Sequence, residues 1–148
     1  MTARLLAIPV PVVAAVNGHA LGGGFALLLA CNYRMAADVE KVGMTEAQAG
    51  IPFPAGPLEI MRHELAPELL RRLALTSAVL GPRAFLEAGV LDELCPAGDL
   101  KSQAVSRAKS LAAQPAFGTV KQQVRGGLAK RLAVLDAVGE DGFLGEFA

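Results

Sequence analysis

Three consecutive glycines stand directly in front of an apolar run, in the stretch HALGGGFALLLACNY at residues 19–33. Glycine loses more conformational freedom on folding than any other residue, so the backbone itself must be needed at this point. The run after the glycines is apolar on every face, which predicts a buried helix. A helix whose first turn is glycine offers unpaired N–H groups at its positive end, with no Cβ to keep a ligand away.

On spacing alone, three explanations fit these glycines. The N–H groups can hold a phosphate or an oxyanion that develops during a reaction, or the glycines can let the helix approach a strand closely. GHALGGG lacks both the G-x-G-x-x-G spacing and the G-K-[ST] ending of phosphate loops, which disfavours a phosphate. Close packing is then the simpler interpretation, and an oxyanion site stays open.

The order of patterns predicts an α/β chain in which strand–turn–helix units come first and helices follow. The run PVVAAV at 11–16 is apolar and rich in β-branched residues, and it ends at Asn17-Gly18, which predicts a buried strand closed by a turn. The remaining expected elements are a helix after the glycines, strands at 33–37, 41–44 and 90–94, a loop at 50–57, helices within 58–77 with a new start at Pro67, a helix over 82–88 closed by Gly89, and two helices from 99 to about 131 broken near 114–115.

The composition is unusually apolar for a monomer in water. Hydrophobic residues make up 53% of the 148 residues, and the mean hydropathy is +0.42. A chain of this length forms one domain with a sizeable core. The apolar excess therefore predicts self-association, or a further part of a larger fold that covers the surface.

Charge, targeting and cysteine patterns narrow the possible partners. Lys+Arg and Asp+Glu both total 14, so no global field attracts nucleic acid or an anionic membrane.

Pro9 and Pro11 interrupt the apolar N-terminal stretch, and nowhere do eighteen apolar residues follow one another. We therefore expect no targeting signal or membrane span, and a cytoplasmic protein. Cys31 and Cys95 lack C-x-x-C spacing and are expected as small buried hydrophobes.

Three stretches carry a resemblance to a known family. PVVAAVNGHALGGGFALLLACNYRMAAD, the following GMTEAQAGI and the later GPRAFLEAGVLDELCP closely resemble the crotonase superfamily, the enoyl-CoA hydratase/isomerase family. The resemblance implies a spiral of ββα turns followed by helices, with residues 1–60 as part of the spiral core and 61–148 as a helical region for trimerisation and covering of coenzyme A. It also implies an acyl-CoA thioester substrate, a homotrimer or hexamer, and no metal or cofactor beyond the coenzyme A of the substrate.

The same resemblance assigns roles to the glycines. The middle one, Gly23, matches the residue whose N–H is one of two that hold the thioester oxygen, and Gly22 and Gly24 flank it at the substrate. In the family the second donor comes from an earlier turn of the spiral, before the point at which this sequence starts. We therefore expect either a piece of a longer polypeptide or a truncated member.

One carboxylate stands out as an acid/base. Family hydratases use two glutamates, and the positions that match them here are Ala26 and Glu46. Hydration needs both, whereas one carboxylate can move a proton from C2 to C4 and so shift a double bond. GMTEAQAGI and CNYR most resemble the Δ3,Δ2-enoyl-CoA isomerase branch. The prediction is therefore an isomerase of the fatty acid β-oxidation type with Glu46 as its acid/base. The alternatives are an enoyl-CoA hydratase and a non-catalytic homologue that acts as an assembly module.

Four further residues are candidates for substrate binding. His19 precedes the glycines by one turn, with a hydrogen-bonded turn histidine as the alternative. Phe53 belongs to the expected apolar surroundings of Glu46. Lys121 and Arg125 share one face of a C-terminal helix and would face the phosphates of coenzyme A, with a merely solvated basic face as the alternative.

Overall fold

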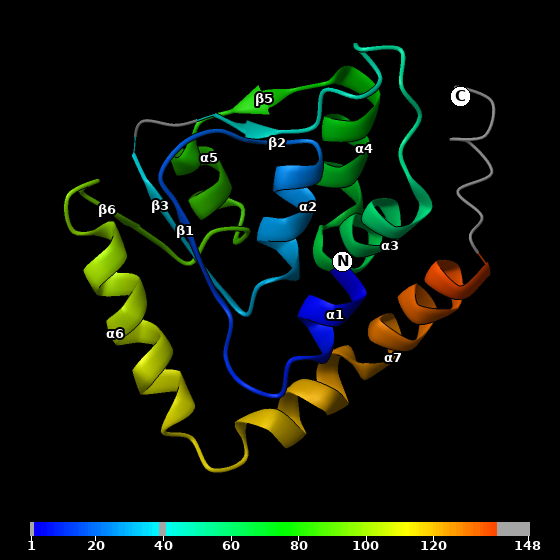
Figure 1. Cartoon of the computed structure of the whole chain (residues 1–148). Coiled ribbons are helices and arrows are strands. Elements are labelled where there is room, and N and C mark those ends of the chain that lie inside the picture. The colour runs from blue at the N-terminus through cyan, green and yellow to red at the C-terminus, as the bar shows by residue number, and fades with distance from the viewer. Residues whose placement is uncertain (1, 39–40, 139–148) are drawn as a thin grey trace.

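The structure is a computed structural model that describes residues 2–38 and 41–138 (Figure 1). The helices are α1 (Thr2–Ala7), α2 (Gly23–Ala30), α3 (Ala55–Glu64), α4 (Pro67–Thr76), α5 (Pro82–Glu87), α6 (Leu100–Ala112) and α7 (Phe117–Val138). The strands are β1 (Val13–Val16), β2 (Ala20–Leu21), β3 (Tyr33–Ala37), β4 (Val42–Gly43), β5 (Val79–Leu80) and β6 (Glu93–Cys95).

The strands form two small sheets, and the chain alternates between them. One sheet has the order β1-β3-β6 with parallel neighbours, and the other has the order β2-β4-β5. β2 and β4 are parallel, and β4 and β5 are antiparallel. The segments β1-β2-α2 and β3-β4-α3 are therefore two successive ββα turns. This arrangement confirms the predicted α/β fold with a ββα spiral followed by helices.

Helix α2 forms the centre of the core. Its buried residues are Phe25, Ala26, Leu28, Leu29 and Ala30, and the Phe25 ring lies against that of Phe85 on α5 with centroids 5.4 Å apart. The helix packs against α1, β2 and α3. A helix that is apolar on every face is stable in water only when it is buried in this way, so the sequence-based expectation for 25–33 is confirmed as far as Ala30.

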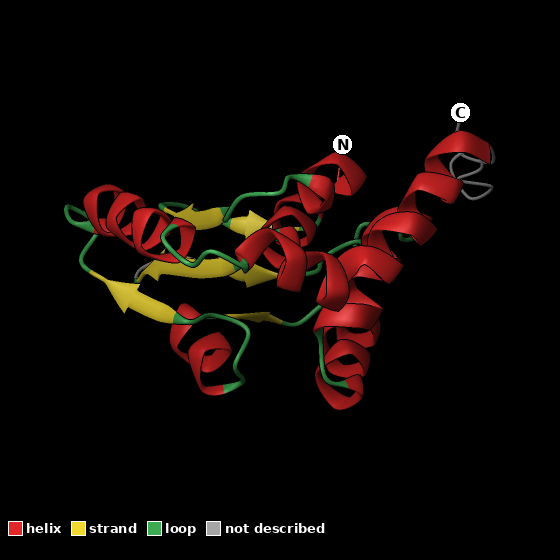
Figure 2. Ribbon diagram, turned by 90° about the horizontal axis from the view of Figure 1, so that it is seen from below, coloured by secondary structure: helices red, strands yellow, loops and turns green. Residues whose placement is uncertain are grey.

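Helices cover the strands on both sides, and α7 extends along one side of the molecule (Figure 2). Leu6 of α1 shares a core cluster with Leu128 and Leu132 of α7. The boundary expected at residue 60 falls inside α3, and this one cluster contains residues from both sides of it.

Several elements differ from the sequence-based expectations. α3 begins at Ala55, inside the expected loop, and Gly56 and Pro57 stand in its first turn. Proline is tolerated there because its missing N–H would have no partner inside the helix. The sequence patterns also missed α1 and the two-residue strands β2 and β5. The expected break near 114–115 is confirmed between α6 and α7, but α7 continues to Val138.

The described part of the chain has neither a membrane-spanning helix nor a cluster of metal-ligating side chains. No helix there is long and apolar enough to cross a membrane, and residues 2–38 and 41–138 hold no group of three or more His, Cys, Asp or Glu that would suit a metal ion. Cys31 and Cys95 are both free thiols and both buried, which confirms the expectation of small buried hydrophobes.

Candidate active site at the amino end of helix α2

The glycine turn leads from β2 directly into α2. Gly22 has φ 53° and ψ −118°, a conformation that favours glycine, and its N–H donates to the Gly43 carbonyl at 3.0 Å. Gly23 and Gly24 form the first turn of the helix, are exposed and have no side-chain cap. A Cβ at either would meet no atom within 4 Å. Close packing therefore does not explain Gly23 and Gly24, because the space on the side-chain face of both residues is open.

The Glu46 carboxylate lies beside this turn. A Cβ placed on Gly22 would stand 2.8 Å from Oε1 of Glu46, and the Thr45 N–H donates to Oε2 at 2.9 Å. β2 pairs with β4 in the register Leu21↔Gly43. This pairing brings Gly22 and Glu46, which are 24 positions apart in the sequence, next to each other. The side chain of Glu46 is half-buried.

A tight turn holds Glu46 in place. The Ile51 N–H donates to the Glu46 carbonyl at 3.0 Å, and the Gly50 N–H donates to the Ala47 carbonyl at 3.2 Å. Gly50 has φ 71°. These two bonds and the left-handed glycine make the Schellman arrangement, which is usual at the end of a helix. The backbone around the carboxylate is therefore closed on itself, and this limits how far Glu46 can move.

The arrangement suits one kind of chemistry. A carboxylate can take a proton from a carbon next to a carbonyl group, and unpaired N–H groups at a helix N-terminus stabilise the negative charge that then develops on oxygen. The Glu46 carboxylate lies beside Gly22, which directly precedes Gly23 in the chain, so the fold brings the two predicted catalytic residues to the same turn.

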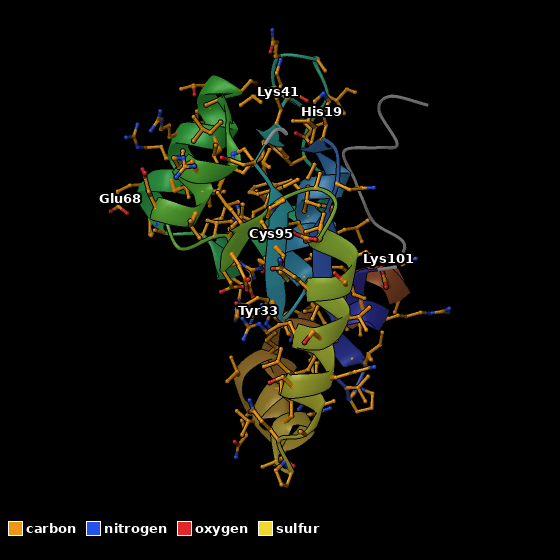
Figure 3. The ribbon with its side chains drawn as sticks, turned by 90° about the vertical axis from the view of Figure 1, so that its left-hand side faces the viewer. His19, Tyr33, Lys41, Glu68, Cys95 and Lys101 are labelled. Carbon is orange, nitrogen blue, oxygen red and sulfur yellow. The ribbon has the colours of Figure 1, made fainter. Side chains whose placement is uncertain are left out.

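His19 and Phe53 contact residues other than Glu46 and Gly23. His19 is exposed and its Nδ1 accepts a hydrogen bond from the Lys41 N–H at 3.3 Å, an arrangement that fits a turn histidine (Figure 3). Phe53 is half-buried and lines a groove between α3 and α7 with Leu58 and Leu135. Their role in substrate binding stays a prediction.

Lys121 and Arg125 are placed differently from either expectation. Both are buried, with 6% and 9% of their surface exposed, so the solvated basic face is wrong. Lys121 Nζ donates to the Val10 carbonyl at 3.2 Å, and burial together with the charge of Arg125 lowers the pKa of the Lys121 ammonium. Arg125 donates to Ala30 and Glu64. Protein atoms thus hold both cations, which leaves binding to coenzyme A phosphates without support from these contacts.

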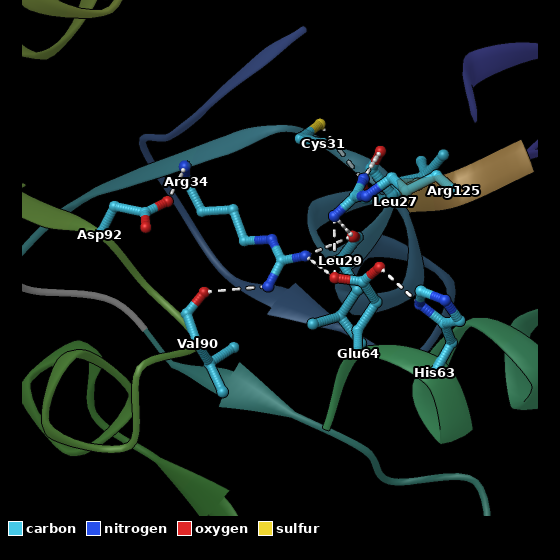
Figure 4. Close-up of polar contacts among 10 residues, drawn as sticks. Leu27, Leu29, Cys31, Arg34, His63, Glu64, Val90, Asp92 and Arg125 are labelled. Carbon is cyan, nitrogen blue, oxygen red and sulfur yellow. Dashed lines mark hydrogen bonds and ion pairs between the residues drawn. The ribbon is translucent and has the colours of Figure 1, made fainter. Parts of the chain in front are cut away.

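Three charged residues meet at the carboxyl end of α2, and sequence reasoning overlooked two of them. Arg34 of β3, Glu64 of α3 and Arg125 of α7 form what we call the carboxyl-end clamp (Figure 4). The signal was present, because Arg34 stands in the otherwise apolar strand YRMAA and is 8% exposed. A charge in a buried strand requires a partner.

Comparison with known proteins shows the family of the chain. The sequence pattern of the enoyl-CoA hydratase/isomerase family matches residues 1–137. The chain belongs to the enoyl-CoA hydratase/isomerase family. An enoyl-CoA hydratase from Mycobacterium marinum is 29% identical, with a TM-score of 0.87, over 99% of this chain and 64% of that chain. An enoyl-CoA isomerase from Mycobacterium tuberculosis is 26% identical, with a TM-score of 0.87, over 95% and 63%.

More distant members of the same fold also match. A methylmalonyl-CoA decarboxylase, solved with 2S-carboxypropyl-CoA, is 19% identical with a TM-score of 0.79, which supports the fold alone. The chain spans less than two thirds of the length of the Mycobacterium hydratase and isomerase. The family match over residues 1–137 confirms the predicted membership of the enoyl-CoA hydratase/isomerase family.

Proposed function

We propose that the protein shifts the double bond of a 3-enoyl-CoA thioester to the 2-position. The Glu46 carboxylate takes a proton from C2, and the electron pair of that C–H bond passes into a dienolate with its charge on the thioester oxygen. The Gly23 N–H holds that oxygen. The protonated Glu46 then delivers the proton to C4, the C2=C3 double bond forms, and the carbonyl group is restored.

The observation that carries the proposal is the carboxylate of Glu46 against Gly22, at the uncapped amino end of α2. A base next to an enolate-stabilising donor is what proton transfer α to a carbonyl requires. Isomerisation needs no second acid or base, because the same carboxylate both removes and returns the proton.

The reaction is preferred to hydration because of Ala26. The resemblance places the second glutamate of hydratases at this position. The side chain of Ala26 is only a methyl group, and the residue is buried in the core with 1% of its surface exposed. It can neither activate water nor transfer a proton. Gly22, Gly24, His19 and Phe53 are proposed as the residues that surround the thioester and its acyl chain.

The decisive experiment is Glu46→Gln, with Glu68→Gln as its control. Glu68 is an exposed carboxylate in the first turn of α4. Formation of 2-hexenoyl-CoA from 3-hexenoyl-CoA is followed with each purified protein. We expect Glu46→Gln to lose about 10²- to 10⁴-fold in kcat while it still binds octanoyl-CoA, and Glu68→Gln to match the parent. An active, folded Glu46→Gln protein ends the proposed mechanism, and an inactive parent favours the non-catalytic assembly module.

We also propose that the protein self-associates as a trimer or a hexamer. Support comes from the apolar composition and from Val120, Val124 and Val134, which α7 exposes to solvent. Sedimentation at micromolar concentration tests this directly. A stable, folded monomer of 15.3 kDa would contradict it.

A further inference from the structure

We propose that Arg125, acting through the carboxyl-end clamp, is a positioning residue for the oxyanion donor at the opposite end of α2. This inference rests on the proposed function. It concerns a residue that touches none of the reacting atoms, on a helix far along the chain from the glycines.

Arg125 holds the last carbonyl groups of α2. Its Nη1 donates to the Ala30 carbonyl at 2.8 Å, and its Nη2 reaches the Leu29 carbonyl at 3.5 Å. Arg34 Nη2 donates to the same Leu29 carbonyl at 2.7 Å. The last four carbonyl groups of a helix have no partner inside it, and positive charge there also favours the helix dipole. Two guanidinium groups thus fasten the end of α2.

A single carboxylate fixes both guanidinium groups. Glu64 Oε2 accepts from Arg125 Nη2 at 2.8 Å and also from Arg34 Nη2. The three side chains are only 9–11% exposed. Charge-assisted bonds of this kind are short and directional, and burial shields them from screening by salt. The clamp therefore defines where the end of α2 lies relative to α3, α7 and β3.

At the other end of α2, the N-cap residue Gly22 is bonded through its N–H to the Gly43 carbonyl at 3.0 Å. The sequence GGFALLLA contains no charged or polar side chain, and apolar contacts are non-directional. An eight-residue helix is about 12 Å long and moves as a rigid body. A tilt at Ala30 pivots the helix about the Gly22 bond and changes the direction of the Gly23 N–H, and errors of about 1 Å at a reacting centre can cost 10²-fold in rate.

The test compares Arg125→Met, Arg125→Lys and the control Arg107→Met. Arg125→Met leaves the Arg34–Glu64 pair balanced in charge but removes the hydrogen bond to the Ala30 carbonyl. Arg125→Lys keeps the positive charge but lacks the planar guanidinium group that bonds Ala30 and Glu64 at the same time. Arg107 of α6 pairs with Glu93 at 2.9 Å and lies over Tyr33, with no bond to α2.

The readouts separate position from mere stability. The probe is octanoyl-CoA with ¹³C at the thioester carbonyl, whose infrared stretch moves to lower frequency when N–H groups hold the oxygen. We expect the parent to show that shift, Arg125→Met to lose most of it, and Arg125→Lys to lie between them. In turnover of 3-hexenoyl-CoA, Arg125→Met should lower kcat about tenfold or more with KM nearly unchanged, while Arg107→Met matches the parent.

Each outcome decides between the proposals. A parent with no carbonyl shift and no turnover contradicts the proposed function itself. A parent with both, together with a folded Arg125→Met protein that keeps the full shift and full kcat, overturns the positioning role. If Arg125→Met does not fold, Arg125→Lys decides, because an unchanged carbonyl shift in that variant also overturns the proposal.

Discussion

The two ends of helix α2 are built in opposite ways. At the amino end the backbone is exposed, the first turn is glycine and no side chain caps it. At the carboxyl end the guanidinium groups of Arg34 and Arg125 donate to the carbonyl groups of Leu29 and Ala30, and Glu64 accepts hydrogen bonds from both arginines. Every helix leaves N–H groups at one end and carbonyl groups at the other without partners. This fold satisfies the carbonyl end itself and leaves the N–H end available to a ligand.

The largest expected effect comes from the carboxyl end of α2, which we call the closed end because the clamp occupies its carbonyl groups; the amino end is the open end. Glu64→Ala leaves the guanidinium groups of Arg34 and Arg125 buried with no counter-charge, a class of change that costs about 3–5 kcal/mol in the free energy of unfolding. Urea denaturation followed by circular dichroism measures it. Glu59→Ala on the same helix is the control, because its partners Arg62 and Arg131 are exposed and we expect a loss below about 1 kcal/mol. Equal losses in the two variants would show that the clamp contributes nothing special.

The second effect concerns the junction between the glycine turn and Glu46. Gly22→Ala places a Cβ 2.8 Å from Glu46 Oε1 and forces alanine into φ 53°, ψ −118°. We expect a loss of about 1–3 kcal/mol in stability and, because the carboxylate must move, a loss of at least about 10²-fold in isomerase activity.

The control for this change is Gly18→Ala, because a Cβ at Gly18 meets no atom within 4 Å and its backbone has no positive φ. If Gly22→Ala and Gly18→Ala behave alike in both stability and activity, the contact between the turn and the carboxylate is not what holds the site.

The open end of α2 was readable from the sequence, and the closed end was not. The glycine turn and Glu46 stand in short continuous stretches, HALGGG and GMTEAQAGI, and the family resemblance of these stretches predicts their roles, whereas spacing alone favoured close packing for the glycines. The α/β class and the order of strands and helices came from local patterns, and the ββα spiral came from the family resemblance. The clamp joins residues 34, 64 and 125, which no local pattern connects, and only the packing of α3 and α7 against α2 shows that they meet.

The same distinction explains the misplacement of Lys121 and Arg125. Helical spacing correctly put them on one face, but the spacing of charges cannot say whether that face is buried. Leu128 and Leu132 continue the face and are buried, with 1% and 2% of their surface exposed. The two leucines on this face of α7 therefore predict its burial better than the two cations do. Lys121 and Arg125 lie on the side of α7 that faces the core.

A third and smaller effect is a pH dependence at the closed end. Burial raises the pKa of the Cys31 thiol, although the charges of Arg34, Arg125 and Lys121 oppose this. The unfolded thiol, with its pKa near about 8.5, therefore ionises before the folded one. Between the two pKa values the folded state binds more protons, so its stability from this group is complete below the unfolded pKa and is lost as pH rises.

Urea midpoints between pH 7 and 10, measured for the parent and for Cys31→Ala, test this dependence. We expect the parent to lose stability more steeply on the alkaline side than Cys31→Ala. Cys95, whose pKa burial also raises, contributes equally to both proteins and cancels in the comparison. Identical alkaline slopes would contradict the assignment to Cys31.

The smallest effect tests the open end and has two opposite signs. Gly24 lies in the first turn of α2, is exposed, and a Cβ there meets no atom within 4 Å. Because alanine is the better helix former, Gly24→Ala should raise the free energy of unfolding by about 0.5–1 kcal/mol. The added methyl group would stand where the thioester must approach the N–H groups, so octanoyl-CoA should bind more weakly by titration calorimetry. A variant that gains stability and binds the thioester as tightly as the parent would mean that nothing approaches this turn, and the openness of the amino end would then have no part in binding.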